Sequence, residues 1–322
     1  MSQFLSNCTA DDLAAAAKHL LAGDLVAFPT ETVYGLGADA SNSKAVARVY
    51  SVKGRPSGHP LIIHISSMDC MGDWVRQVPE YAVALARNFW PGPMTLVLKR
   101  SKLAGDFITG GQDTIGVRVP DHVVALALLQ AFERSGGKGV AAPSANRFGH
   151  VSPTTASAVV GELGSHLSKD DLVLDGGACA VGVESTIIDC TGSSPRVLRP
   201  GAISISMIED VTGLNVLSDG NQSEIRVSGS LENHYAPAAK VLLRETPISG
   251  QGFIAYASIE TPKGVIRLAS PQSEQEFARS LYSALREADA QGLTEVVVAQ
   301  PNDIGIGIAI RDRLARAAFK SL

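Results

Sequence analysis

Short apolar runs alternate with longer amphipathic stretches over residues 1–204. The apolar runs are rich in Val, Ile and Leu and are bounded by Gly, Pro, Asp or Ser, a pattern typical of buried strands. The predicted strands are 25–29, 60–65, 95–99, 115–119, 139–144, 171–175 and 185–190. The predicted helices are a first helix capped by Thr9 and Asp12 and ended by Gly23, then 44–52, 79–89, 121–134 and 153–167. This alternation predicts an α/β domain on a twisted, open, mixed sheet.

The pattern loosens between residues 205 and 238 and becomes regular again after them. Gly, Ser, Asn and Pro with little periodicity predict a linker over 205–238. Residues 239–322 then predict a smaller β-α-β unit of Rossmann-like size, without the GxGxxG fingerprint. Its helices are predicted at 274–290, with a capping box and a Gly stop, and from about 307. We expect the arginines of the last helix, Arg313 among them, to lie on a solvated face.

Composition and charge narrow the class of protein. With 322 residues, 45% hydrophobic and 19% charged, the chain fits two globular domains. Basic residues number 17 against 18 acidic ones over 1–204, and 11 against 14 over 205–322, which argues against a broad electrostatic grip on nucleic acid. Four dispersed cysteines exclude a disulfide framework or a zinc knuckle. Without an export leader or a run of about 20 apolar residues, we expect a cytoplasmic protein with no membrane contact.

Polar clusters stand at the predicted strand ends, where α/β folds place their ligands. In PTETVYGLG (29–37), short hydroxyls could hold an amino-acid carboxylate or hydroxyl, although a polar turn shaped by Gly35 and Gly37 is the commoner meaning. In KGRPSGHPLIIHI (53–65), Lys53 and Arg55 could face one side and bind a triphosphate, or form a solvated helix end. His64 follows in an apolar strand, where a core histidine is the commoner outcome.

A third cluster places Arg118 among β-branched residues of a buried strand. A buried guanidinium needs a carboxylate, which either an internal acid or a substrate could supply. In APSANRFGHVSPTTA (142–156), Ser144 and Asn146 follow a strand of small residues, and Ser152 precedes a helix. Such hydroxyls near a helix N-terminus could cradle an anion, although capping alone would account for Ser152.

The last cluster runs through DGGACAVGVESTIIDC (175–190) to Arg199. Gly176, Gly177 and Gly182 permit a ligand to approach the backbone closely, although a Gly-rich hairpin is the commoner meaning. The polar residues Glu184 to Thr186 precede an apolar strand.

Taken in order, these segments resemble the YrdC-type threonylcarbamoyl-adenylate synthases in their long, two-domain form. The resemblance is dense over 10–204 and resumes at HYAP (234–237) and GIGIAIRDRLARAA (305–318). It implies a YrdC-like catalytic domain with a concave groove at 1–204, a linker covering the active site at 205–238, and a Rossmann-like domain at 239–322. It also implies a nucleotidyltransferase that makes threonylcarbamoyl-AMP and pyrophosphate from L-threonine, bicarbonate and ATP. A separate transferase would then modify tRNA.

The resemblance also implies roles for individual residues. The L-threonine pocket would consist of Thr32, His64, Arg118 and Ser185. The ATP site would consist of Lys53, Arg55, His59, Thr114, Ala142, Ser144, Asn146, Ser152, Arg199 and Tyr235. Lys53 and Arg55 would stabilise the transition state, and Mg²⁺ would arrive on the ATP phosphates rather than in a protein cage. Ala178 and Phe148 depart from residues common in the family, as does SGSLEN before HYAP.

Two other functions stay open at the level of sequence. The groove could bind structured RNA, although the balanced charge and the lack of interleaved aromatics argue against more than a weak contact. Alternatively, a carbamoyl-adenylate enzyme could act on another acceptor.

Overall fold

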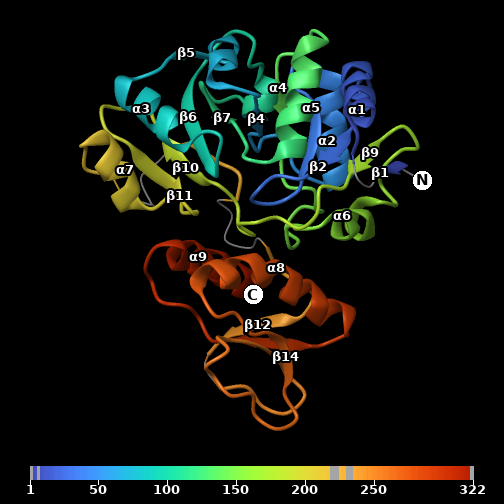
Figure 1. Ribbon diagram of the computed structural model, residues 1–322, viewed down its shortest axis with the longest axis vertical. Helices are drawn as coiled ribbons and strands as arrows, with labels where there is room; N and C mark the ends of the chain where they lie inside the picture. Colours follow the sequence, from blue (N-terminus) through green and yellow to red (C-terminus); the bar gives the residue numbers. More distant parts are fainter. Residues whose placement is uncertain (1–2, 6–7, 218–224, 230–234, 245, 320–322) are drawn as a thin grey trace.

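The computed structural model describes residues 3–5, 8–217, 225–229, 235–244 and 246–319. These residues form two sheets, a large one within residues 3–199 and a small one within 240–298. Figure 1 shows the larger domain above the smaller one, with helices α8 (Glu274–Ala290) and α9 (Ile306–Ala318) on the side of the small sheet that faces the larger domain. Segments 218–224 and 230–234 of the predicted linker, including His234, lie outside the described residues.

The large sheet is mixed, as predicted. Its strands are β1 (Gln3–Leu5), β2 (Val26–Phe28), β3 (Gly35–Asp39), β4 (Ile62–His64), β5 (Val75–Gln77), β6 (Met94–Arg100), β7 (Thr114–Arg118), β8 (Val140–Ala141), β9 (Leu172–Leu174), β10 (Thr186–Asp189) and β11 (Arg196–Arg199). They lie in the order β1-β9-β2-β3-β8-β4-β7-β6-β10-β11, with β5 beside β6. The parallel pairs β4–β7 and β6–β10 bring several strand ends to one edge of the sheet.

The described helices of the larger domain are α1 (Ala10–Ala22), α2 (Ser43–Lys53), the 3₁₀ helix η1 (Met68–Asp73), α3 (Glu80–Phe89), α4 (Asp106–Thr109), α5 (Val123–Arg134), α6 (Ala156–Leu163) and α7 (Ile205–Thr212). Helices η1, α4 and α7 were not predicted, and the others correspond to predicted helices. Helix α6 is shorter than predicted and has Thr155 as its N-cap, so capping does not account for Ser152. Thr9 and Asp12 form the capping box of α1, and Gly23 ends that helix in the left-handed conformation. Both signals are confirmed.

Strand β3 lies where the sequence allowed a polar turn. Its residues GLGAD lack the β-branched side chains that usually indicate a strand. A Cβ on Gly37 would lie 2.8 Å from both the Phe28 ring and Val140, so the glycine lets β3 pack closely against the neighbouring side chains. The interpretation of Gly37 as a turn residue is therefore wrong.

The predicted linker begins with a folded segment. Residues 205–212 form α7, which is capped by Ser204 and ends at Gly213. Ile208 on this helix is buried in the core of the larger domain. The expectation of irregular structure directly after residue 204 is therefore wrong, because a short helix with one buried side chain gives little periodicity to detect.

The smaller domain is a parallel sheet with α8 and α9 packed against it. Its strands are β12 (Lys240–Leu243), β13 (Gly252–Ile254), β14 (Ile266–Ala269) and β15 (Glu295–Val298), in the order β12-β15-β13-β14. Helix α8 has the predicted bounds, and Ser273 caps it by accepting the Glu276 amide. The prediction of a Rossmann-like α/β unit is confirmed.

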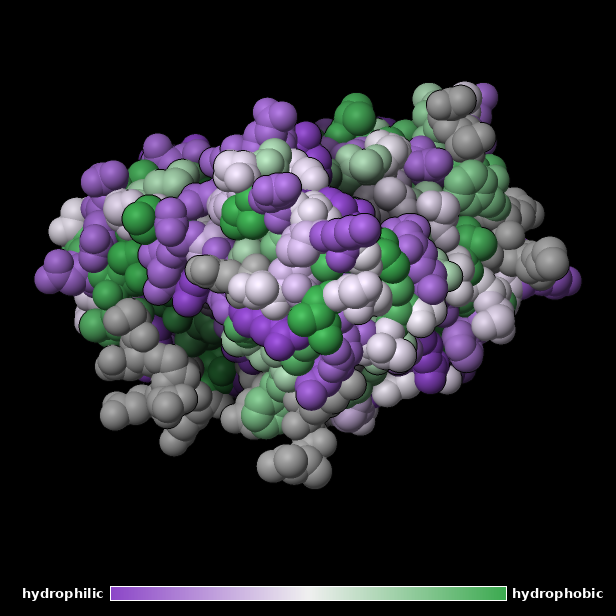
Figure 2. All heavy atoms as spheres, turned by 90° about the horizontal axis from the view of Figure 1, so that it is seen from below, coloured by the Kyte–Doolittle hydropathy of each residue, from purple (hydrophilic) through white to green (hydrophobic). Residues whose placement is uncertain are grey.

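The lower face of the molecule mixes polar and apolar residues. Figure 2 shows apolar side chains scattered among polar ones when the molecule is seen from the side of the smaller domain. Ile248 and Ile304 are exposed singly in that domain. None of the helices formed by the described residues is long and apolar enough to cross a membrane.

A buried carboxylate ties α2 to the start of β2 and predicts a stability effect. Asp171 is fully buried and accepts hydrogen bonds from the Leu25 and Ser168 amides and from the Arg48 guanidinium. We expect Asp171→Ala to lower the free energy of unfolding by about 3 kcal/mol, because two amides and a cation lose their partner. Urea unfolding measures the change. Asp170→Ala, at an exposed neighbour, is the matched control, and equal stability of the two variants would contradict the assignment.

Candidate active site

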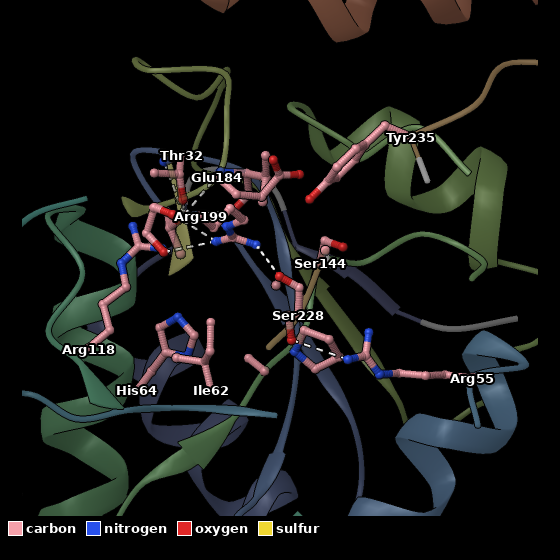
Figure 3. A pocket seen from close by; sticks show the side chains of 17 residues that line it. Thr32, Arg55, Ile62, His64, Arg118, Ser144, Glu184, Arg199, Ser228 and Tyr235 are labelled. Carbon is pink, nitrogen blue, oxygen red and sulfur yellow. Dashed lines mark hydrogen bonds between the residues drawn. The ribbon is translucent and has the colours of Figure 1, made fainter. Parts of the chain in front are cut away.

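A cavity opens at the strand ends of the larger domain, with about 530 Å³ of empty space when the solvent at its mouth is included. Side chains from the loop after β2, from the ends of β4, β7 and β11, and from the segment after β8 line it. Ser228, Gly229 and Tyr235 close it from the segments that follow the large sheet. Figure 3 shows Arg118, His64 and Thr32 on one side of the cavity and Arg55 with Ser228 on the other. Residues of the predicted L-threonine pocket and of the predicted ATP site therefore line the same cavity.

Nine of the predicted site residues line this cavity. They are Thr32, Arg55, His64, Arg118, Ala142, Ser144, Ser185, Arg199 and Tyr235. The other five lie beside or behind the cavity wall: Lys53, His59, Thr114, Asn146 and Ser152.

Lys53 lies behind the wall. Its side chain is buried, and its ammonium donates to the backbone carbonyls of Ser144 and Asn146. Burial, together with the charge of Arg55, lowers the pKa of Lys53 well below its usual range. In this structure Lys53 fixes the segment that carries Ser144.

The remaining four residues occupy different surroundings. The Asn146 amide donates to the carbonyls of Arg147 and His150, and the Ser152 hydroxyl donates to Glu184 at 2.6 Å. Thr114 lines a smaller adjoining cavity. His59 packs edge-on against Phe148, whose ring also lies under the Arg55 guanidinium at 5.7 Å. Phe148, a departure from the family pattern, thus supports a cavity arginine.

Arg118 has an internal partner. Its guanidinium lies 2.7 Å from Glu31, and its Nε donates to the Gly92 carbonyl at 3.3 Å. Arg118 and Glu31 are both buried. Glu31 is therefore the internal acid that the sequence analysis gave as one of two possible partners of Arg118. Arg118 also faces the cavity, so a ligand carboxylate could approach it there.

Two further arginines add positive charge to the cavity. Arg199 donates to the carbonyl and hydroxyl oxygens of Ser185 and to the Ser228 carbonyl. Arg55 donates to the Pro60 carbonyl and to the Ser228 hydroxyl. Burial lowers the pKa of Arg55 to about 10. A cavity bordered by three buried arginines, held mostly by neutral oxygens, favours anionic ligands.

His64 contributes a neutral imidazole. Burial, with a smaller effect from the nearby Arg118 charge, lowers its pKa to about 3. Its ring packs edge-on against Phe28 with centroids 5.9 Å apart. At neutral pH the ring can therefore exchange hydrogen bonds with a ligand but adds no charge.

Sequence reasoning missed the role of Glu184. Its buried carboxylate lines the cavity and accepts hydrogen bonds from Ser152, from the Tyr282 hydroxyl at 2.9 Å and from Arg313 at 2.8 Å. Burial has the largest single effect and would raise its pKa, but the charges of Arg313 and Arg199, together with the hydrogen bonds from Arg313 and Ser152, outweigh burial and lower the pKa to about 2. The expectation that Arg313 lies on a solvated face is wrong, because its buried partner belongs to a segment about 130 residues earlier in the chain.

Gly182 serves the contact between the two domains. Its backbone is left-handed, with φ of 86°, and a Cβ there would lie 2.4 Å from the Ala278 carbonyl on α8. The sequence predicts that this glycine admits a ligand or shapes a hairpin, but the close neighbour of Gly182 is a helix of the smaller domain.

Comparisons with known proteins agree with this architecture. The model of the Sua5/YciO/YrdC family, described as telomere recombination, matches residues 18–201. The chain belongs to the Sua5/YciO/YrdC family. A second family model, described as the C-terminal domain of threonylcarbamoyl-AMP synthase, matches residues 203–319. The suspected family is therefore confirmed.

Relatives cover nearly the whole chain. The threonylcarbamoyl-AMP synthase of Pyrococcus abyssi is 40% identical over 94% of this chain and 93% of its own. The threonylcarbamoyl-AMP synthase of Bacillus subtilis is 38% identical over 95% of this chain and 92% of its own. The crystal structure of P. abyssi Sua5 complexed with L-threonine matches with a TM-score of 0.87 and 35% identity, over 99% of this chain and 97% of that one. The Sua5-type fold thus extends over both domains.

The depressed pKa of His64 predicts a pH effect on stability. An unfolded chain protonates histidine near pH 6.5, whereas folded His64 stays neutral down to about pH 3. Stability is therefore lost as the pH falls below about 6.5, by up to about 1.4 kcal/mol per pH unit.

We expect His64→Gln to reduce the drop in unfolding free energy between pH 7 and pH 5 by roughly 2 kcal/mol. Urea unfolding at the two pH values measures it, with the exposed His166→Gln as the control. An unchanged drop in His64→Gln would contradict a neutral, buried imidazole.

Proposed function

We propose that this protein uses ATP, L-threonine and bicarbonate to make L-threonylcarbamoyl-AMP, with release of pyrophosphate. The observation that carries the proposal is the cavity itself, which joins a side with Arg118, His64 and Thr32 to a side with Arg55. Such an arrangement suits a carboxylate-bearing substrate beside a polyphosphate. The names of the P. abyssi and B. subtilis relatives support the same reaction.

L-threonine would occupy the side of the cavity near β4 and β7. Arg118 would bind the α-carboxylate, which joins Glu31 as a second anionic partner of a buried guanidinium. Thr32, Ser185 and the neutral His64 would hydrogen-bond the substrate's polar groups. The L-threonine bound to the related P. abyssi Sua5 supports this substrate.

ATP would occupy the side near Arg55. Arg55, Ser144 and Arg199 would bind phosphate oxygens, and Ala142 and Tyr235 would border the nucleoside. Lys53, Asn146 and Ser152 would fix the surrounding segments from behind, as their hydrogen bonds to backbone or to Glu184 support. Thr114 and His59 would lie at the margins.

The reaction requires positioning and charge neutralisation more than an acid–base pair. The amine of threonine attacks bicarbonate, and loss of water leaves a carbamate. A carbamate oxygen then attacks the α-phosphorus, and the bond to the pyrophosphate leaving group breaks. Fixed arginines stabilise the charge that accumulates on the phosphate oxygens during this displacement.

Magnesium would enter as part of the ATP complex. Among the described residues no cluster of three or more His, Cys, Asp or Glu is arranged to hold a metal ion. Among the described residues that line the cavity, Glu184 is the only carboxylate, and it already accepts three side-chain hydrogen bonds. These residues fit a cation carried by the phosphates, which Mg²⁺ prefers when protein ligands are few.

The product would pass to a transferase that modifies tRNA. Because tRNA is modified there, we propose a cytoplasmic location for the protein. Contact with that transferase and weak contact with RNA stay predictions.

Removal of either cation tests the ATP side. We expect Arg55→Ala to lower turnover at least tenfold, or about 1.4 kcal/mol, because a phosphate-binding charge is lost. Lys53→Ala should lower it by as much, because the Ser144 segment loses its anchor. Lys44→Ala, on the exposed side of α2, is the matched control for steady-state kinetics. Near-normal turnover in both test variants would contradict the assignment of Arg55 and Lys53 to the ATP side of the cavity.

Omission of single components tests the reaction. Purified protein is incubated with ATP, Mg²⁺, bicarbonate and L-threonine, and the products are followed by mass spectrometry. We expect pyrophosphate and a threonylcarbamoyl-AMP mass that require both threonine and bicarbonate. Binding of ATP without that product would favour another acceptor. Steeply salt-dependent RNA binding without ATP turnover would favour the RNA-binding function.

A further inference from the structure

The smaller domain inserts a charged side chain into the structure that supports the cavity. Arg313 on α9 is 1% exposed, and its guanidinium has partners on several segments. Its Nε donates to Glu184, and its other nitrogens donate to Asp312 at 2.6 Å and to the Pro200 carbonyl at 3.0 Å. It also lies 5.3 Å from the centre of the Tyr235 ring. Three of these four neighbours belong to segments that border the cavity.

Glu184 links that guanidinium to the residues of the proposed ATP and threonine sites. One carboxylate oxygen accepts the Ser152 hydroxyl, and the other accepts Tyr282 and Arg313. The next residue, Ser185, lines the cavity and accepts hydrogen bonds from Arg199. The position of Glu184 therefore fixes the backbone and hydroxyl that hold Arg199.

Arg199 lies close to the same carboxylate. It donates to Ser185, the residue after Glu184, and its charge also acts on Glu184. While Arg313 neutralises Glu184, Arg199 can stay on Ser185 and Ser228, facing the cavity. A buried carboxylate that loses its cation must find another or become protonated. Loss of Arg313 would therefore draw Arg199 toward Glu184 and away from its present contacts with Ser185 and Ser228.

We propose that Arg313 is a positioning residue of the active site, through which the smaller domain holds Glu184 and thereby keeps Arg199 free for the substrates. The inference deepens the proposed function and rests on it. The smaller domain then completes the active site across the domain contact. Val33, Val151 and Val183 of the larger domain pack in the same apolar cluster as the core of the smaller domain, which keeps the two parts of this contact together.

The charges around Glu184 predict a distinctive pH dependence. The ionisable groups that face it are Arg313 on α9, Tyr282 on α8, Arg199 on β11 and Tyr235. Without Arg313, the charge of Arg199 and the hydrogen bond from Ser152 still lower the pKa of Glu184, but burial, the largest influence, raises it. At high pH the anionic Glu184 would pull on Arg199, whereas protonation at lower pH would release it. The defect of an Arg313 variant should therefore shrink as the pH falls.

The test compares four proteins: wild type, Arg313→Met, Glu184→Gln and the double variant. Initial rates of threonylcarbamoyl-AMP formation give kcat/KM for ATP between pH 5.5 and pH 8.5. We expect Arg313→Met to lose at least about tenfold at pH 8.5, and this loss should shrink severalfold at pH 5.5. In the Glu184→Gln background, removal of Arg313 should change kcat/KM less than about twofold at either pH, because no anion remains to attract Arg199.

Arg311→Met is the matched control, because Arg311 lies on the same helix but is half-exposed, with partners at Asp303 and the Pro301 carbonyl, away from Glu184. It should keep the wild-type rate. If Arg313→Met does not fold, the comparison of Glu184→Gln with the double variant still tests the inference. A purely structural role for Arg313 would lower kcat/KM in the double variant as well, whereas a role through Glu184 would not.

Two outcomes would overturn the inference. One is a wild-type kcat/KM in Arg313→Met. The other is a loss of kcat/KM in Arg313→Met that does not change with pH and that recurs in full when Arg313 is replaced in the Glu184→Gln background. Absence of threonylcarbamoyl-AMP from the wild-type reaction would instead contradict the proposed function, so the two failures are distinguishable.

Discussion

Both domains depend on the hydrogen bonds and the ion pair that the buried carboxylate of Glu184 forms. It accepts hydrogen bonds from Ser152 of the larger domain and from Tyr282 and Arg313 of the smaller one. An anion at this depth is tolerated only while its charge and its lone pairs are matched, so partners from both domains have to be in place together. The arrangement couples the docking of the smaller domain to the wall of the cavity.

The cavity itself is organised around arginines that already have partners. Arg118 lies against Glu31, while Arg55 and Arg199 donate to backbone and hydroxyl oxygens. Neutral oxygens satisfy the geometry of a guanidinium but do not cancel its charge, so the cavity remains electropositive. Anionic substrates can add to these contacts while the framework behind them stays fixed. The arrangement suits a reaction that relies on alignment and electrostatic stabilisation.

The sequence predicted much of this structure where the signals are local. The capping box of α1, the bounds of α8 and the alternation of strands and helices depend on neighbouring residues, and they are confirmed. The need of Arg118 for a carboxylate also followed from its own strand, but the sequence could not choose Glu31. Of the predicted site residues, nine line the cavity, because strand ends converge at one edge of the sheet.

The parts that the sequence did not predict depend on distant contacts. Arg313 looked solvated because its partner Glu184 lies in the other domain, and helical periodicity does not identify such a partner. The sequence left Lys53 either on a triphosphate or at a solvated helix end, yet its ammonium is buried against carbonyls that follow β8. Strand β3 was obscured by its glycines, which are needed for close packing rather than for a turn.

A crystal structure with L-threonine and a non-hydrolysable ATP analogue tests the central claim most directly, because it locates both ligands at once. The account predicts the threonine carboxylate on Arg118 and the triphosphate on Arg55 and Arg199, within the cavity closed by Tyr235, with Arg313 still bound to Glu184. Ligands bound outside this cavity, or a triphosphate that contacts none of these arginines, would contradict it.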